Sequence, residues 1–448
     1  MERMTLKEAF DLAVKKHQEG LLSEAKEIYL KILEKDSVNS DVIHLLGVID
    51  HQEGRYEDAV ERISEAIRLK EGDEIYHYNL AMAYDALGED EKAADNFEKV
   101  LEINLDYNKA HIAHYNLGVF YSERGQIKEA LKHYDEAVFL DSAFYDARWN
   151  RALCLLLQGN FEEGWKEYHC RFKKKSPTDT RVFDKPEWEG EALEGKTLLV
   201  LSEQGFGDNI QFVRYLSKIE GRVVLECRDE LRALFEKVGG VDEFVEREKG
   251  VVPNVEFDYY IHLMDLPRVF GTTGENIPAE IPYLKADDGL VEKFREGMDG
   301  DFKVGIVWAG NPEQASDKNR SVEFEMFREL RKIPGVSLFS LQKGEASKQI
   351  DVSDVVDMGA KIKNFSDTAA IIENLDLIIS VDTSVAHLAG AMGKPTWVLL
   401  GFLPDWRWFL GREDSPWYPG MKLFRQRRKG DWKGVFENVK RELGKIRD

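Results

Sequence analysis

The amino-acid sequence predicts an α/α helical solenoid followed by an α/β region built from two similar halves. Two observations carry this prediction. Glycines recur at an almost constant spacing through the first part of the chain, and after residue 196 continuous apolar stretches alternate with helical patterns. A connector that contains Pro177, Pro186 and Trp188 separates the two parts. With 448 residues, the chain has room for about three domain-sized units.

The composition predicts a folded protein with an acidic surface. Hydrophobic residues make up 43% and charged residues 32% of the chain, and the net charge is -21. An acidic surface repels phosphate backbones and anionic lipids, so we expect no nucleic-acid partner. Cys154, Cys170 and Cys227 lack C-x-x-C spacing, which argues against a zinc site and a disulfide framework. No apolar signal core or membrane-length stretch occurs, so we expect a cytoplasmic protein without a membrane span.

The glycine period defines five helical repeats. Gly20, Gly54, Gly88, Gly125 and Gly159 are separated by 34, 34, 37 and 34 residues. A small residue follows each glycine by five positions and a large one by nine, and another small residue precedes it. Two antiparallel helices approach closely only where both present small side chains, and glycine tolerates a positive φ in the turn between them. One such pair cannot bury its apolar face alone, so the pairs stack.

This pattern resembles a tetratricopeptide repeat array, which we expect over residues 1–173. In the last three repeats, the residue two positions before the small residue of the first helix is an asparagine: Asn79, Asn116 and Asn150. Asparagine both donates and accepts hydrogen bonds, so a row of them suits an extended peptide backbone. The sequence therefore predicts a peptide-binding groove. The alternative is that these side chains bond neighbouring turns within the solenoid.

The region after the connector (residues 174–195) predicts two Rossmann-like halves, residues 196–290 and 291–448. Continuous apolar strands with helices between them indicate parallel sheets covered on both faces. Ligands of such sheets bind at the carboxyl ends of the strands, so functional residues are expected there. The expected strands are Thr197–Ser202, Arg222–Cys227, Tyr259–Leu263, Phe302–Trp308, Val336–Leu341, Leu377–Val381 and Thr396–Leu400.

The loop after the first strand reads EQGFGD, residues 203–208. Gly205 and Gly207 are expected to let the backbone turn sharply and a ligand approach. A dinucleotide-binding fingerprint requires a small residue at position 210, which is Ile210, so NAD binding is disfavoured. Asp208 either caps the following helix or projects into the cleft between the halves as a general base.

The strongest local signal for a ligand site is the segment that starts at Asp382. Thr383 and Ser384 are typical helix N-cap residues, and the unpaired N–H groups of the following helix form an anion site. His387 lies in the first turn of that helix, on the side expected to face the ligand. The alternative is a capped helix with a histidine in the core.

Further candidate donor-binding residues follow other strands of the second half. Arg320 offers a planar fork for an anion, and Lys343, next to Gln342, suits a phosphate. Their alternatives are a surface-loop arginine and an ordinary solvated lysine. The aromatic segments 402–408 and 415–419 either stack on a base or sugar or pack the C-terminal lobe.

Together, Gly207-Asp208, the WAG–N turn (308–311), LQKG (341–344) and DTSVAHLAGAMGKP (382–395) resemble glycosyltransferase family 9, the heptosyltransferase-like group of GT-B enzymes. The resemblance covers about residues 196–425. It implies that Asp208 is the catalytic base, that Asp382, Thr383, Ser384 and His387 form the donor-diphosphate loop, and that Lys343 binds a donor phosphate. The fusion to repeats resembles, in architecture, the O-linked N-acetylglucosamine transferases.

The first half is short for that family, and its basic residues for a lipopolysaccharide acceptor are not evident. Heptose and lipopolysaccharide core are therefore not the expected substrates, and the appended repeats indicate a protein or peptide acceptor instead. Taken with the resemblance, this implies an inverting, metal-independent glycosyltransferase with a nucleotide-sugar co-substrate and no other cofactor. The alternative is a non-catalytic repeat scaffold with a degenerate transferase domain.

Overall fold

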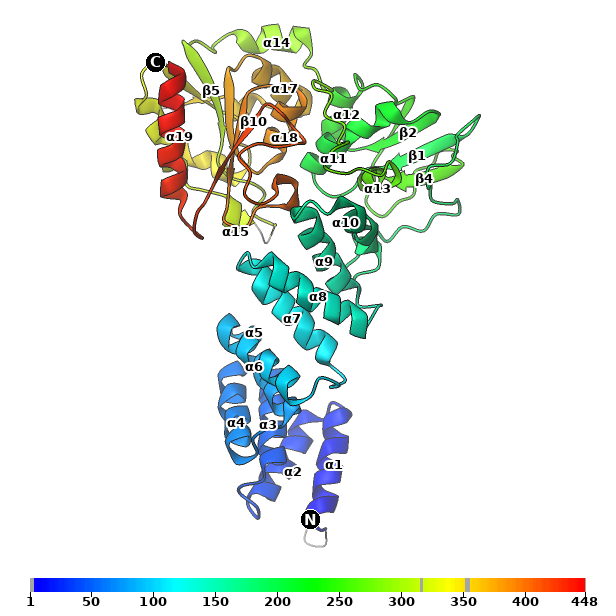
Figure 1. Cartoon of the computed structure of the whole chain (residues 1–448), viewed down its shortest axis with the longest axis vertical. Coiled ribbons are helices and arrows are strands. Elements are labelled where there is room, and N and C mark those ends of the chain that lie inside the picture. Colours follow the sequence, from blue (N-terminus) through cyan, green and yellow to red (C-terminus); the bar gives the residue numbers. More distant parts are fainter. Residues whose placement is uncertain (1–3, 315–316, 351–354, 448) are drawn as a thin grey trace. The chain divides into compact units, whose positions relative to one another are not determined.

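The computed structural model describes residues 4–314, 317–350 and 355–447, and the chain divides into two compact units, residues 1–151 and 152–448 (Figure 1). The division falls within α9 (Tyr145–Leu157). Helices arranged in antiparallel pairs come first along the chain. They are α1 (Leu6–Gln18), α2 (Leu22–Leu33), α3 (Ser40–Gln52), α4 (Tyr56–Leu69), α5 (Glu74–Ala86), α6 (Asp90–Ile103), α7 (Ala110–Glu123), α8 (Ile127–Leu140), α9 (Tyr145–Leu157) and α10 (Phe161–Tyr168).

The packing of the helical pairs follows the repeat predicted from the sequence. All five repeat glycines have a positive φ, between 72° and 84°. The small residues that flank them are buried where two helices cross, and at Gly118 an added Cβ would lie 2.5 Å from the ring of Tyr134. The longer spacing before Gly125 coincides with a longer connection between the end of α6 at Ile103 and the start of α7 at Ala110.

The first sheet of the second unit has four parallel strands in the order β3-β2-β1-β4. They are β1 (Thr197–Leu201), β2 (Arg222–Cys227), β3 (Glu243–Glu246) and β4 (Tyr259–His262). Helices α11 (Phe206–Phe212) and α12 (Asp229–Phe235) follow β1 and β2. The connector runs along the outer edge of β4, where the Trp188 N–H donates to the Tyr260 carbonyl (2.8 Å).

The second sheet has six parallel strands in the order β10-β9-β8-β5-β6-β7. They are β5 (Phe302–Val307), β6 (Val336–Ser340), β7 (Val356–Asp357), β8 (Leu377–Val381), β9 (Thr396–Leu400) and β10 (Met421–Arg425). Helices α17 (Phe365–Glu373) and α18 (Ser384–Ala391) lie on one face of this sheet, and α19 (Trp432–Arg447) lies on the other (Figure 1).

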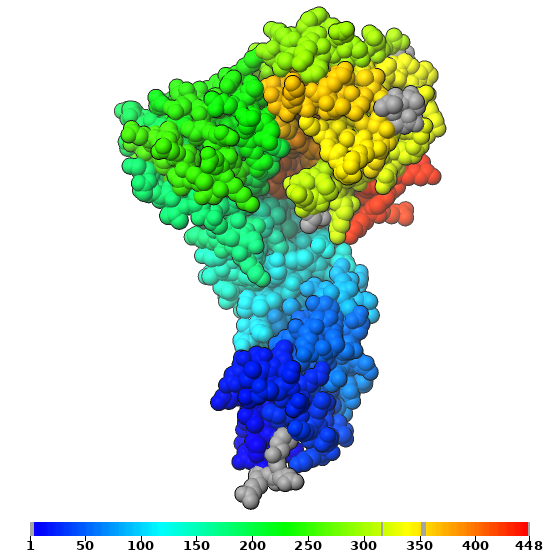
Figure 2. Space-filling view, turned by 180° about the vertical axis from the view of Figure 1, so that it is seen from behind, coloured from blue at the N-terminus to red at the C-terminus, as the bar shows by residue number. Residues whose placement is uncertain are grey.

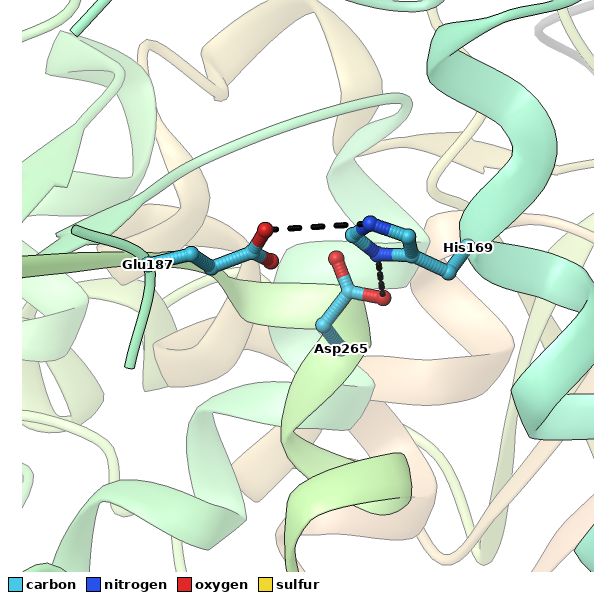
Figure 3. A group of neighbouring side chains, drawn as sticks. All are labelled: His169, Glu187 and Asp265. Atoms are coloured by element: carbon cyan, nitrogen blue, oxygen red, sulfur yellow. Dashed lines mark hydrogen bonds and ion pairs between the residues drawn. The ribbon is translucent and has the colours of Figure 1, made fainter. Parts of the chain in front are cut away.

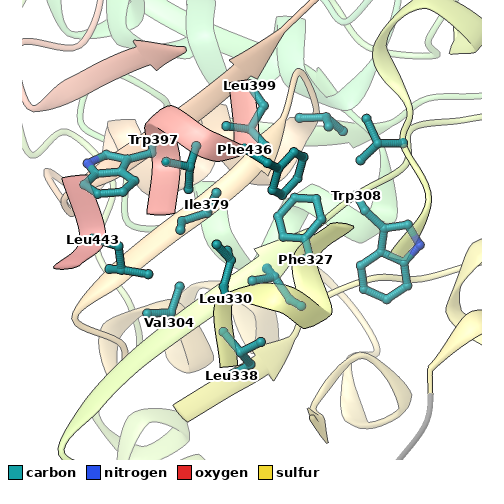
Figure 4. Close-up of a cluster of buried hydrophobic side chains, with 14 of the residues drawn as sticks. Val304, Trp308, Phe327, Leu330, Leu338, Ile379, Trp397, Leu399, Phe436 and Leu443 are labelled. Carbon is teal, nitrogen blue, oxygen red and sulfur yellow. The ribbon is translucent and has the colours of Figure 1, made fainter. Parts of the chain in front are cut away.

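The core of this half lies between the sheet and α19. Val304, Ile379 and Leu399 from three neighbouring strands pack against Phe436 and Leu443 of α19, and all five side chains are buried (Figure 4). This burial on both faces explains why the strands read as continuous apolar runs rather than as alternating patterns.

The seven strands expected from the sequence are all present, within a residue or two at their ends. The sequence did not predict β3, β7 and β10. The side chains of β3 are only half-buried, and β7 has two residues, so neither carries a continuous apolar run. Within the described residues, no helix combines the length and the apolar character that crossing a bilayer requires.

Candidate functional site

The two halves of the second unit meet through helices that follow the central strands of their sheets. Helix α11, after β1, packs against α18, after β8. The approach is close, because a Cβ on Gly207 would lie 2.9 Å from the His387 ring. Figure 2 shows a hollow between the green first half and the yellow part of the second, with orange atoms lying deep in it. The carboxyl ends of both sheets therefore contribute to one region.

Asp208 lies in the first turn of α11, on the side of the second half. Its Oδ2 accepts a hydrogen bond from the Gly205 N–H (2.7 Å), so the carboxylate takes part in capping its own helix. Its Oδ1 accepts from Arg407 Nη2. The side chain remains 18% exposed. Burial raises the pKa of Asp208 above its ordinary value, while Arg407 and the Gly205 N–H oppose the rise.

The sharp turn before α11 is made by a residue that the sequence did not indicate. Gln204 adopts the left-handed conformation, with a φ of 53°, whereas Gly205 is extended, with a φ of -87°. The prediction that the two glycines make the sharp turn was therefore wrong, and the predicted approach of a ligand to them stays a prediction. Gly205 is the N-cap of α11, and Gly207 permits the close packing of α11 against α18.

Arg407 is a site residue that the sequence did not single out. It lies in the 3-10 turn η7 (Trp406–Trp408) of the second half, and 6% of its surface is exposed. Besides Asp208, it donates to Gln211 Oε1 (2.7 Å) and to Asp405 Oδ1 (2.8 Å). Arg407 thus connects α11 in one half to η7 in the other, and it places a fixed positive charge beside Asp208.

The N-terminus of α18 is open. Thr383 is its N-cap residue but makes no side-chain capping bond; its hydroxyl instead shares a hydrogen bond with Ser380 Oγ (3.0 Å). In the described part of the chain, the backbone N–H groups of Ser384 and Val385 have no acceptor. Both residues are half-exposed. Unpaired N–H groups and the positive end of the helix dipole favour an anion at this position.

Asp382 and His387 lie side by side at this helix end. His387 Nε2 is 3.9 Å from Asp382 Oδ1, and His387 Nδ1 shares a hydrogen bond with the Tyr418 hydroxyl (2.9 Å). Burial, together with nearby arginines, holds the pKa of His387 well below its ordinary value, so the imidazole is neutral. Burial and the charge of Asp405 raise the pKa of Asp382 to about 6.

The three remaining donor-side candidates lie at the same edge of the second sheet. Gln342 is buried; its Oε1 accepts from the N–H groups of Trp308 and Ala309 (3.0 and 2.9 Å), so it ties the end of β6 to the end of β5. Lys343 is exposed and donates to the Ile362 carbonyl (2.6 Å). Arg320 donates to Asp317 Oδ1 (3.0 Å).

Most side chains of the aromatic segments pack the lobe, whereas Phe402 is exposed. Trp406, Trp408, Trp417 and Tyr418 are at most 3% exposed, which favours packing over stacking on a base or sugar for these side chains. Trp408 stacks on the His387 ring, with centroids 5.2 Å apart.

In the first unit, the asparagine row makes hydrogen bonds within the solenoid. The Asn79 amide donates to His44 Nε2 (2.8 Å), and the Asn150 amide lies 3.5 Å from the Tyr115 hydroxyl; both partners belong to the preceding repeat. The Asn116 amide donates to the Ile112 carbonyl of its own helix (3.0 Å). All three side chains are half-buried, and a peptide-binding role for them stays a prediction.

Comparison with known proteins matches separate segments of the chain to two kinds of protein family. Residues 75–107 and 115–168 match tetratricopeptide repeat families, and residues 345–406 match glycosyltransferase family 9 (heptosyltransferase). The last match contains Asp382, Thr383, Ser384 and His387 but not Asp208. Segments of the chain thus match tetratricopeptide repeats and, further along, glycosyltransferase family 9.

Protein FlbA of Caulobacter vibrioides is 28% identical over 321 residues, which cover 64% of this chain and 53% of that protein. The chain thus spans about half the length of this curated relative. Among solved structures, MamA is 24% identical over 35% of this chain and 91% of its own, with a TM-score of 0.32. YrrB, described as a TPR protein with an unusual peptide-binding site, is 20% identical over 37% and 83%, with a TM-score of 0.33.

Proposed function

We propose that the second unit is an inverting, metal-independent glycosyltransferase of the GT-B type. It moves a sugar from a nucleotide-diphosphate donor to a hydroxyl of a protein or peptide that the repeats recruit. One observation carries the proposal: the open N-terminus of α18 lies against the helix that bears Asp208. An anion site and a carboxylate of raised pKa, contributed by opposite halves, are what such a transfer requires.

On the donor side, the N–H groups of Ser384 and Val385 hydrogen-bond the diphosphate. Lys343 and Arg320, which now contact a carbonyl and a carboxylate of the protein, supply positive charge to the same edge of the sheet. These groups stabilise the charge that develops on the leaving diphosphate, a task that a metal ion performs in other enzymes. Gln342 acts indirectly, because its side chain holds the ends of β5 and β6 together.

On the acceptor side, Asp208 is the general base. As the acceptor oxygen attacks the anomeric carbon, its proton moves to the Asp208 carboxylate, and the bond from that carbon to the diphosphate oxygen breaks. Attack from the face opposite the leaving group inverts the anomeric configuration. The raised pKa of Asp208 makes its ionised carboxylate a stronger base.

The repeats supply the acceptor, and the asparagine row is the proposed contact with its backbone. All three cysteines are buried and form no disulfide bond within the described residues, in keeping with the predicted cytoplasmic location. The alternative function is a scaffold in which the transferase domain is degenerate. The Arg407–Asp208 pair is the observation that favours it, since an arginine already occupies one oxygen of the proposed base.

The test is a panel of nucleotide sugars incubated with the full chain, with release of nucleoside diphosphate and the mass of any glycosylated protein as readouts. We expect one donor to be consumed, and the matching nucleoside diphosphate to raise the melting temperature by binding the native state. A chain that is stabilised by no nucleotide and consumes no donor would instead be the scaffold.

A further inference from the structure

The helix that completes the last repeat also contacts the loop that carries Asp208. Tyr168, the final residue of α10, is buried, and its hydroxyl accepts a hydrogen bond from Gln204 Nε2 (2.9 Å). Gln204 is the residue of that loop with a left-handed backbone conformation, and its carbonyl accepts a hydrogen bond from Arg228 Nη2. A side chain other than glycine is strained in this conformation and persists only where its surroundings hold it.

A second contact comes from η1 (His169–Phe172), the turn directly after α10. Arg171 is fully buried and binds two carboxylates at once. Its Nε and Nη2 donate to Glu203 (2.9 and 2.6 Å), and its Nη1 and Nη2 donate to Asp265 (3.0 and 2.7 Å). Glu203 directly precedes Gln204, and Asp265 follows β4. The arginine therefore joins the carboxyl ends of β1 and β4.

The surroundings of Asp265 favour an arginine rather than a metal ion. His169 Nδ1 lies 3.2 Å from Asp265 Oδ1, and His169 Nε2 lies 3.7 Å from Glu187, which gives a histidine between two carboxylates (Figure 3). Both oxygens of Asp265 already accept from Arg171, so a cation there would meet a fixed positive charge. This group is part of the bracing of the loop.

Helix α10 also contacts both halves of the second unit. The Trp165 ring lies edge-on to Phe212 of the first half (6.0 Å between centroids) and to Trp406 of the second (5.1 Å). Phe161 meets Trp417 in the same way (6.0 Å). The segment from Phe161 to Phe172 is therefore packed into the transferase unit, although most of it matches a repeat family.

We propose that Tyr168 and Arg171 are positioning residues that hold the Glu203–Gly207 loop, and through it Asp208, in the geometry for transfer. The expected effect on kcat rests on the proposed function. The expected effect on the order of the loop rests on the geometry alone. It makes the end of the repeat array a component of the active site.

The first test is Tyr168→Phe, which removes one hydroxyl and keeps the ring. We expect kcat to fall about five- to tenfold, because the hydroxyl loses its hydrogen bond from Gln204 and its weak bond to Met264 Sδ (3.8 Å). The donor KM should stay unchanged, because the proposed diphosphate contacts lie in the other half. The matched control is Tyr29→Phe in α2, another fully buried tyrosine, whose hydroxyl has no partner within the described residues. It should leave both constants unchanged.

The second readout needs no turnover. Amide hydrogen exchange measured by mass spectrometry should speed up in peptides that cover residues 203–212 of Tyr168→Phe, and not in those that cover 382–391. Arg171→Lys keeps the charge but cannot fork to both carboxylates, whereas Arg171→Met also removes the charge. We expect the exchange rate in the loop to be lowest in the wild type, higher in Arg171→Lys and highest in Arg171→Met.

Unchanged exchange at residues 203–212 in both Tyr168→Phe and Arg171→Lys would overturn the positioning role. A raised donor KM with an unchanged kcat would also overturn it, since that pattern indicates a lost substrate contact. If the wild-type chain consumes no donor, the proposed function has failed, and the exchange measurement still decides whether these residues hold the loop.

Discussion

The two loops that meet between the halves of the second unit are built in opposite ways. The loop before α11 is braced by charged and polar groups: Arg407, Arg171 and Tyr168 all bond to it or to Asp208. The loop before α18 carries no side-chain cap, and its first N–H groups have no acceptor in the described part of the chain.

This difference matches two different tasks. A general base must be aimed within hydrogen-bond reach of one proton, so its loop needs to be held. An anion site must leave its donors unpaired until the ligand arrives, so its loop needs to stay open. The braced loop is therefore the candidate for chemistry, and the open loop is the candidate for binding.

The largest effect that follows from this contrast is expected for Asp208→Asn. The amide cannot take up the proton of the attacking hydroxyl, so kcat should fall by about 10²–10⁴-fold, the usual contribution of a general base. Nucleoside diphosphate affinity, measured by calorimetry, should stay at the wild-type value. A variant that turns over at the wild-type rate would remove Asp208 from the chemistry and leave the open loop as a binding site only.

Arg407→Met should have the next largest effect. Without the guanidinium, burial raises the pKa of Asp208 further, so the base stays protonated to higher pH. The acidic limb of the kcat/KM profile should move to higher pH. At a given pH on that limb, kcat/KM should fall about tenfold for each pH unit of the shift. Arg407→Lys keeps the charge and should retain most of the wild-type profile. An unmoved limb in Arg407→Met would mean that the arginine does not set the ionisation of the base.

The smallest effect is expected on stability, from Asp382→Asn. The pKa of Asp382 in the folded protein is about 6, above the value of about 3.9 for an unfolded chain. The folded protein therefore favours the protonated form of Asp382. The stability that this form contributes to the free energy of unfolding is lost as the pH rises through 6. The variant should gain about 1–3 kcal/mol in unfolding free energy between about pH 4 and pH 8, relative to wild type. Urea denaturation of both proteins at pH 4 and pH 8 measures this gain. An equal difference in unfolding free energy between variant and wild type at both pH values would contradict a raised pKa of Asp382.

The sequence predicted the parts of the fold and of the site that depend on residues close together in the chain. The repeat glycines, the strand ends and the helix after Asp382 are set by residues close together in the chain. Arg407 and Asp208 are 199 positions apart, and Arg171 and Asp265 are 94 apart, so no spacing connects them. Gln204 was missed for another reason, because the adjacent glycines are the residues that tolerate a positive φ most readily.

The central claim, that the open end of α18 binds the donor diphosphate, is tested most directly by Ser384→Pro. Ser384 is the first residue of the helix and Thr383 is extended (φ -140°, ψ 168°), so proline fits there and removes only one N–H. Nucleoside diphosphate affinity, measured by calorimetry, should fall about 10–100-fold, as expected for one lost hydrogen bond to a charged group. Ser384→Ala, which keeps the N–H, should bind like wild type. Equal affinity in the proline and alanine variants would contradict the account.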